Sequence, residues 1–481
     1  MSEDTDLLVV GGALAGLTAA NRALELGQRV VVLEAASEPS HACASRVNSG
    51  CFHVAFRGLA NGPHVLVRAL EGITHGFTDP QLARLIGHNA ARSVRWLAAA
   101  GVEFKPISPT VEWKQDVFAP YGGFQESTTY IWKGWGADLA LDVLERRVGR
   151  LGGRVVRGTK LVELIMENNR CCGSVGEGPD GRVAYRAKAV VLADGGFEGN
   201  PDMLRRFISP NPENVTLRGV PAAKGDGIRL AEAVGAKLIG MEAFYGHVLS
   251  ADSLKREGLN PFPFLEFLAS VGMMLDGKGE RFVDETAGGH YTSNVLARHG
   301  NGLATVVFDD TMWNTTGTHF LCPPNPSLVK AGGTLHRADD FETLAKMAGL
   351  APAMLRHQVE QHNAKVDARK AATASSSEDR SKLTPFTQGK YQPERFEKPP
   401  YYAAPACAGL TYTFGGVAIN DQAQVLRNDG TVIEGLLAAG STCGGIEGGP
   451  HVGYMGGLIK ASVLGLAASE GFTKRNGSRA V

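Results

Sequence analysis

A glycine-rich turn near the start of the chain constrains the fold more than any other feature of the sequence. The apolar run Leu7–Val10 leads into Gly11-Gly-Ala-Leu-Ala-Gly16, a helical pattern follows, and a second apolar run ends at Glu34. This order of strand, tight turn, helix and strand predicts a βαβ unit. The turn keeps small residues at the positions of the G-x-G-x-x-G fingerprint of nucleotide-binding folds, with alanine in the middle position.

The same turn predicts a site for a diphosphate. Free N–H groups and the positive end of a helix dipole meet where a strand turns into a helix, and both favour an anion. Glu34 ends the second strand, where a carboxylate accepts hydrogen bonds from a ribose 2′-hydroxyl and repels a 2′-phosphate. The fingerprint alone does not separate FAD from NAD, and its alternative interpretation is a turn that only packs a helix tightly on a sheet.

Charge and hydropathy exclude two classes of partner. Lysine plus arginine count 49 and aspartate plus glutamate count 49, which leaves no basic excess for binding nucleic acid. No apolar run approaches the roughly 20 residues that a membrane helix needs. The acidic segment Met1–Asp6 leads directly into a strand, unlike a signal peptide, so we expect a cytoplasmic protein without a membrane span. Seven irregularly spaced cysteines indicate neither a disulfide framework nor a metal site.

The length and the distribution of glycine predict more than one domain. A chain of 481 residues exceeds the size at which one core stops growing. Glycine pairs are frequent at both ends but thin out between about Met241 and Ser381, where prolines break the chain into short elements. This pattern predicts an inserted domain, and the polar tract Ala371–Arg380 predicts an exposed loop near its end.

Further stretches resemble the fumarate reductase and succinate dehydrogenase flavoprotein superfamily. These are Val191–Phe197, Gly279–Glu285, and Gly435–Gly440 followed by Gly456-Gly457. Within that superfamily, other stretches are most similar to the FAD-dependent tricarballylate dehydrogenase branch: Leu217–Gly219, Gly225–Gly227, Asp284-Glu285 with Tyr291, and Thr411–Gly416.

The resemblance implies an α/β fold with FAD as cofactor. We expect a Rossmann-like FAD-binding domain of the GR2 type, split by an inserted α+β capping domain, with the substrate between them. The expected boundaries are 1–240 and 386–481 for the FAD-binding domain and 241–385 for the cap. The residues expected at the cofactor are Gly11, Gly12, Ala15, Gly16, Glu34, Ala35, Ser49, Gly50, Ala193, Asp194, Gly195, Asp226, Gly440, Ser441, Leu458 and Ile459.

Departures from the family pattern argue against fumarate reduction itself. Trp313 stands where fumarate reductases carry a proton-donating arginine, and Tyr454 stands where an arginine holds a substrate carboxylate. Tyr412 replaces a histidine, whereas His247 matches a histidine of the family. Three charged or basic groups are therefore replaced by aromatic side chains.

Tyr454 instead resembles the tyrosine that 3-ketosteroid Δ1-dehydrogenases place at the substrate ketone. Desaturation next to a carbonyl removes an α-proton and passes hydride to flavin N5, so negative charge grows on the carbonyl oxygen. The Tyr454 hydroxyl and the N–H groups of the last helix would stabilise that charge. The proton acceptor stays open among His247, His290, Tyr291 and Tyr412.

These features predict an FAD-dependent dehydrogenase or desaturase, or the reverse ene-reductase, acting on a small carbonyl or carboxylate substrate. No second glycine-rich βαβ unit is apparent, so we expect an electron acceptor other than NAD(P). The alternative is a redox-partner or assembly flavoprotein with structural FAD. Cys43 occupies the position of the flavin-linked histidine of succinate dehydrogenases, but most of the broader family binds FAD without a covalent bond, so we expect dissociable FAD.

Overall fold

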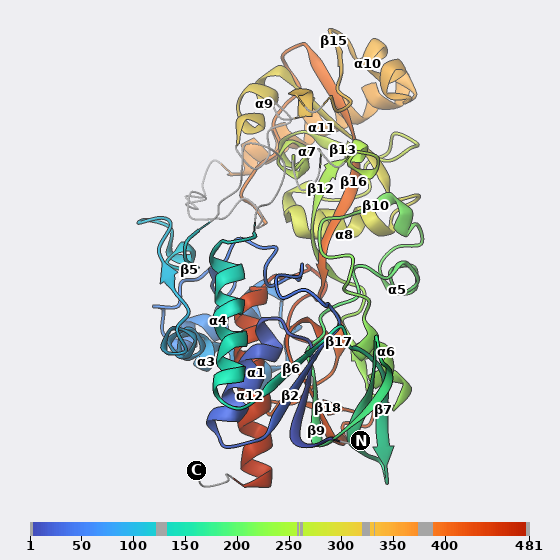
Figure 1. Cartoon of the computed structure of the whole chain (residues 1–481). Coiled ribbons are helices and arrows are strands. Elements are labelled where there is room, and N and C mark those ends of the chain that lie inside the picture. Colours follow the sequence, from blue (N-terminus) through green and yellow to red (C-terminus); the bar gives the residue numbers. More distant parts are fainter. Residues whose placement is uncertain are drawn as a thin grey trace.

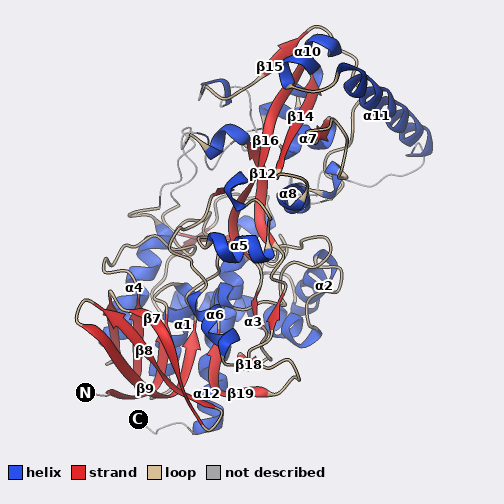
Figure 2. Cartoon of the chain, turned by 90° about the vertical axis from the view of Figure 1, so that its right-hand side faces the viewer, coloured by secondary structure: helices blue, strands red, loops and turns tan. Residues whose placement is uncertain are grey.

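The computed structural model describes residues 3–121, 132–256, 259, 263–319, 328–330, 332–373 and 388–477. They form two lobes, each with its own sheet (Figure 1). The long strand β16 (Tyr401–Thr413) runs from the upper lobe down to the lower one (Figures 1 and 2).

An eight-stranded sheet forms the frame of the lower lobe. Strands β19, β9, β1, β2 and β6 are parallel neighbours, β18 pairs antiparallel with β19, and β8 and β7 continue antiparallel from β9. The apolar runs of β1 and β2 are buried on both faces, as a central parallel sheet requires. The strands are β1 (Glu3–Val10), β2 (Val30–Glu34), β6 (Arg154–Arg157), β7 (Lys160–Glu167), β8 (Arg170–Gly178), β9 (Gly181–Leu192), β18 (Gln424–Leu426) and β19 (Val432–Ala438).

Helices cover this sheet. Helix α1 (Leu14–Glu25) packs against α12 (Gly457–Asn476) and α4 (Gly136–Arg150), and α12 also contacts α3 (Pro80–Ala99). The side chain of Asp79 caps α3 by accepting hydrogen bonds from two first-turn N–H groups. Smaller elements of this lobe are α2 (Pro63–Ile73), α5 (Pro201–Phe207), α6 (Asp226–Ala233), β3 (Cys51–Phe52), β4 (Phe104–Lys105), β5 (Asp116–Phe118), β11 (Leu238–Ile239) and β17 (Gly416–Val417).

The upper lobe is built around β16. This strand pairs with β10, β12, β14 and β15, and β13 pairs with β14 to complete a six-stranded sheet. A separate apolar core lies beneath it, with Leu268, Met274 and Val307 among its fully buried members. The other elements are β10 (Val215–Leu217), β12 (Phe244–Ser250), β13 (Met273–Leu275), β14 (Leu303–Asp309), β15 (His336–Ala338), α7 (Glu266–Val271), α8 (Gly289–Arg298), α9 (Asp310–Asn314), α10 (Phe341–Ala348) and α11 (Pro352–Thr373).

The α/β fold expected from the sequence is confirmed, with the βαβ unit β1-α1-β2 at its start. The boundaries at 240 and 385 stay predictions; β10 and β16 lie outside that segment yet pair with strands inside it. Of the polar tract 371–380, α11 includes the first three residues and the rest lie outside the described residues. In the part of the chain that the structure describes, no helix is long and apolar enough to cross a bilayer.

Candidate active site

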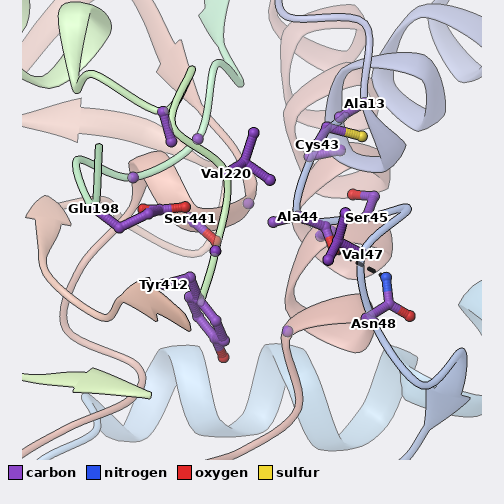
Figure 3. Close-up of a pocket in the computed structure, with 18 of the residues that line it drawn as sticks. Ala13, Cys43, Ala44, Ser45, Val47, Asn48, Glu198, Val220, Tyr412 and Ser441 are labelled. Atoms are coloured by element: carbon purple, nitrogen blue, oxygen red, sulfur yellow. Dashed lines mark hydrogen bonds between the residues drawn. The ribbon is translucent and has the colours of Figure 1, made fainter. Parts of the chain in front are cut away.

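A cavity of about 860 Å³ lies where the two lobes meet. The turn between β1 and α1 lines its lower part, and β12 and the end of β16 line its upper part. Figure 3 shows two walls that face each other across this space, one from the β1–α1 turn and the segment after β2, and the other from later loops and the end of β16. The first wall carries Ala13, Cys43, Ala44, Ser45 and Val47, and the second carries Glu198, Val220, Ser441 and Tyr412.

The turn at the cavity floor leaves no room for side chains. Gly11 has a φ of +104°, and a Cβ there would lie 2.4 Å from the carbonyl oxygen of Ala193. A Cβ on Gly16 would lie 1.9 Å from the carbonyl oxygen of Gly11. Helix α1 starts after Ala13, which has no side-chain oxygen to cap it, and the first turn holds no acidic residue. The N-terminus of α1 is therefore suited to an anionic ligand such as a diphosphate.

Glu34 is fixed at the edge of this floor. Its carboxylate accepts one hydrogen bond from the N–H of Gly12 and another from the N–H of Ala36, both at 2.7 Å. The Nε2 atom of His41 lies 3.5 Å from the same carboxylate. Glu34 lines the cavity beside the turn, and its role at the ribose of a nucleotide stays a prediction.

Most residues expected at the cofactor line this cavity. Three of them, Gly16, Gly50 and Ile459, do not line it among the described residues. Cys43 does line it, and burial raises the pKa of its thiol, which therefore stays protonated at neutral pH. Those that line it are Gly11, Gly12, Ala15, Glu34, Ala35, Ser49, Ala193, Asp194, Gly195, Asp226, Gly440, Ser441 and Leu458.

Two acids, half-buried Asp194 and buried Glu198, face the cavity from the segment after β9. Asp194 accepts a hydrogen bond from the N–H of Gly227 at 2.7 Å, and burial raises the pKa of its carboxyl to about 6. Burial raises the pKa of Glu198 to about 8, so its carboxyl is protonated at neutral pH. The Oε2 atom of Glu198 has no hydrogen-bond partner in the described parts of the chain. A buried polar atom of this kind points to a polar ligand group, and the glycine floor fits FAD as that ligand.

The start of helix α12 closes another side of the cavity. Gly457 and Leu458 line it, and the capping residue Gly456 offers no side-chain oxygen. A second helix N-terminus therefore points at the site, where it would stabilise negative charge on a bound flavin.

A buried ion pair holds the loop before α12 in place. The Oε1 atom of Glu447 accepts hydrogen bonds from the hydroxyl of Tyr412 at 2.9 Å and from the N–H groups of Met455 and Gly456 at 3.1 and 3.3 Å. Its Oε2 atom lies 3.4 Å from Nζ of Lys460, and both side chains are fully buried. Because its hydroxyl proton is directed to Glu447, Tyr412 has a positioning role in this arrangement.

Strand pairing brings the upper residues of the site together. Tyr245 and His247 on β12 lie opposite Tyr412 and Gly409 on β16. The register shifts after Tyr245, which leaves Thr411 of β16 as the extra residue of a β-bulge. Since residues i and i+2 of a strand share a face, Tyr245 and His247 point to the same side, and both line the cavity.

His247 is held by a buried carboxylate. Its Nδ1 atom lies 2.6 Å from Oε1 of Glu266, whose Oε2 accepts the N–H of Val248 at 2.7 Å. Burial lowers the pKa of His247 well below its usual value and raises the pKa of Glu266 to about 8, so burial opposes charge on both groups. A Cβ on Gly289 would lie 2.4 Å from Oε1 of Glu266, so this glycine makes room for the carboxylate. On the other side of the ring, Nε2 of His247 lies 3.4 Å from the hydroxyl of Tyr245.

The remaining predicted residues take different places. Tyr454 lines the cavity with its ring centroid 4.5 Å from that of Tyr245, and burial raises its pKa well above the usual value. His290 lies behind Tyr245, with ring centroids 4.5 Å apart, and its Nδ1–H donates to the carbonyl oxygen of Gly246 at 2.9 Å. Tyr291 stacks near His451 at 5.9 Å. Among the described residues, neither His290 nor Tyr291 lines the cavity.

Sequence reasoning missed four polar residues of the site: Glu198, Arg218, Tyr245 and Glu266. The spacing of Tyr245 from His247 is a signal that could have identified the tyrosine, because both lie on one strand face. Glu266 lies on a separate helix, α7, and only the fold brings it to His247.

Comparisons with known proteins agree with this site. A family model described as an FAD binding domain matches residues 6–453. Probable fumarate reductase Ifc3 of Shewanella frigidimarina is 26% identical over 467 residues, covering 94% of this chain and 72% of the relative. NADH:acrylate oxidoreductase of Vibrio harveyi is 26% identical over 377 residues, which cover 77% of this chain but 35% of that protein. The chain thus spans about a third of that relative's length.

A solved structure shares the whole fold. The crystal structure of 3-ketosteroid Δ1-dehydrogenase from Sterolibacterium denitrificans matches with a TM-score of 0.74 at 19% identity, covering 98% of this chain and 100% of that one. The expected FAD cofactor is confirmed, whereas the likeness to the tricarballylate dehydrogenase branch stays a prediction. The chain belongs to the FAD binding domain family, within the fumarate reductase/succinate dehydrogenase flavoprotein superfamily.

Proposed function

We propose that the protein is an FAD-dependent oxidoreductase that removes or adds hydrogen across the carbon–carbon bond next to a carbonyl or carboxylate. The substrate class is a small organic acid or cyclic ketone, and the electron acceptor is a carrier other than NAD(P). The observation that carries the proposal is the linked set Glu266, His247 and Tyr245, which opens into the FAD cavity beside Tyr454. The names of relatives as reductases and dehydrogenases support it.

Proton transfer falls to the linked set. One proton lies between Nδ1 of His247 and Oε1 of Glu266, which are 2.6 Å apart; with that proton on Nδ1 and Glu266 ionised, Nε2 accepts a proton from the Tyr245 hydroxyl. Burial raises the pKa of Tyr245 to about 12, so the phenol acts as a base only when its proton passes to His247 as the substrate proton arrives. FAD, when bound, supplies the two-electron chemistry by exchanging hydride at flavin N5.

Tyr454 serves the opposite end of the reacting system. Burial raises the pKa of its hydroxyl, which therefore remains a hydrogen-bond donor at any working pH. A donor at the carbonyl oxygen, together with the N–H groups that open α12, stabilises the negative charge that develops there. The linked set therefore transfers the proton, and Tyr454 binds the carbonyl oxygen.

An anaerobic experiment tests this proposal. Dithionite-reduced holoenzyme is mixed with a panel of cyclic enones, unsaturated carboxylates and steroid ketones, and the return of the oxidised flavin spectrum is followed. We expect at least one compound to reoxidise the flavin, and Tyr245→Phe to slow that reaction by roughly a hundred- to ten-thousandfold with FAD retained.

Tyr401→Phe is the matched control, because that tyrosine begins β16 in the upper lobe and stacks on Phe341. It should leave the rate unchanged. A panel in which no compound reoxidises the flavin, or an unaltered rate in Tyr245→Phe, would contradict the proposal.

A further inference from the structure

We propose that Arg218 binds a carboxylate of the substrate and that this carboxylate is carried on a flat, largely apolar body. The proposal rests on the proposed function and narrows its substrate class. It assigns to Arg218 an anchoring role at a position different from the arginines that the chain has replaced.

The side chain of Arg218 is fixed in the roof of the cavity. Arg218 follows β10, and its N–H donates to the carbonyl oxygen of Leu410 on β16 at 2.7 Å. Its Nη1 atom donates to the hydroxyl of the bulge residue Thr411 at 2.5 Å. A Cβ on Gly409 would lie 2.6 Å from Cδ of Arg218, so a glycine on β16 makes the space that the arginine occupies. The guanidinium is thereby held at the cavity wall.

Arg218 forms no ion pair within the described residues, although Tyr245 and Glu266 lie near enough to favour its charged form. Its Nε atom is buried without a hydrogen-bond partner among those residues. Glu266 is engaged with His247 and with the N–H of Val248. Burial lowers the pKa of Arg218 to about 10, so the group is still cationic at neutral pH. A buried cation with unused donors is stable only when an anion joins it, and a planar carboxylate matches a guanidinium best.

Aromatic side chains near Arg218 indicate the shape of the rest of the substrate. The guanidinium lies 4.9 Å from the ring centroid of Phe264, which stacks on His247 at 3.9 Å. An anion on Arg218 would therefore lie close to the proton-transferring set. The rings of Phe56, Trp113 and Tyr454 also line the cavity, and Lys114 lies beside Trp113. Aromatic walls of this kind accept a flat apolar ring.

The test compares two probes of the same shape, trans-cinnamate and trans-cinnamamide. Their dissociation constants are measured on the oxidised holoenzyme from the change in flavin absorbance, without turnover. We expect cinnamate to bind roughly ten- to a hundredfold more tightly than the amide. Arg218→Met should abolish this preference while FAD content stays unchanged, and Arg218→Lys should retain part of it.

Arg298→Met is the control, because Arg298 is an exposed arginine of α8 that contacts a backbone carbonyl and does not line the cavity. It should keep the preference. If Arg218→Met fails to fold, Gly409→Ala is the second variant: its Cβ would meet Leu249 at 2.5 Å and Arg218 at 2.6 Å, so it displaces the arginine while preserving its charge and should weaken the binding of cinnamate more than that of the amide.

Equal affinities in the wild type, binding of neither probe, or a preference that persists in Arg218→Met would overturn the proposal. These outcomes differ from failure of the proposed function. If cinnamate is preferred but none of the enones, unsaturated carboxylates and steroid ketones reoxidises the flavin, Arg218 is supported as an anion site and the proposed reaction is wrong.

Discussion

The floor and the roof of the cavity offer different kinds of groups to a ligand. The floor comes from one continuous segment, β1-α1-β2, and offers backbone N–H groups made accessible by Gly11 and Gly16. The roof comes from three separate strands and one helix, and offers individual side chains such as Arg218 and His247. We infer that changes in the floor abolish cofactor binding, whereas changes in the roof alter chemistry and leave FAD in place.

The largest effect is expected from Gly11→Val in the floor. A valine side chain at a φ of +104°, against the carbonyl oxygen of Ala193, occupies the path of the diphosphate. The variant should be colourless or unfolded, as judged by flavin absorbance and circular dichroism. Gly149→Val is its control, since Gly149 lies in α4 with nothing within 4 Å of the added Cβ. A yellow Gly11→Val protein with full activity would defeat the prediction.

A smaller effect is expected from Tyr454→Phe, in the loop that lines the cavity before α12. Only a hydroxyl is removed, so FAD content should stay the same while the rate of flavin reduction by substrate falls roughly ten- to a thousandfold. Stopped-flow absorbance measures this rate. Tyr185→Phe on β9 is the control and should react like the wild type. An unchanged rate in Tyr454→Phe would make Tyr454 a packing residue.

The smallest effect concerns the pH dependence of stability through Glu198. Its pKa is raised from the ordinary 4.5 to about 8, so the folded state holds a proton that the unfolded state has released between these values. The free energy of unfolding should therefore fall as pH rises through this window, by at most about 1.4 kcal/mol per pH unit from this group. Above about pH 8 its contribution levels off.

Glu198→Gln should remove that part of the slope. Urea unfolding of the FAD-saturated protein gives the free energy of unfolding at pH 5 and pH 8. The change between the two pH values is compared in the variant and the wild type. Because Glu266 shares the same window, only this difference is informative. Glu177→Gln, at an exposed glutamate on β8, should match the wild type. Identical slopes in Glu198→Gln and the wild type would show that Glu198 is ionised throughout.

The floor could be predicted from the sequence because consecutive residues form it. The order of β1, turn, α1 and β2 is written in consecutive residues, and Glu34 ends the second strand where the fingerprint requires an acid. The family resemblance then supplied FAD, which the comparisons confirm. The tests above address the individual site residues.

The roof could not be predicted in the same way, because strand register decides which of its side chains reach the cavity. Arg218 reaches the cavity only because β10 pairs with β16 and Gly409 leaves space for it. Thr411 meets Arg218 only because a bulge shifts β16 by one residue. The elevated pKa of Glu198 arises from burial, which no local pattern in the sequence reports.

The helices α1 and α12, with the capping residues Ala13 and Gly456, make the stability of the fold depend on the concentration of FAD. Neither residue has a side-chain oxygen; the N–H of Leu14 donates to Oγ of Ser45 at 3.3 Å, and a bound ligand would accept hydrogen bonds from other first-turn N–H groups. By mass action, each tenfold rise of free FAD above its dissociation constant adds about 1.4 kcal/mol to the free energy of unfolding. Molecules without FAD are therefore expected to unfold more often, and we expect the abundance of the protein to follow the supply of its cofactor.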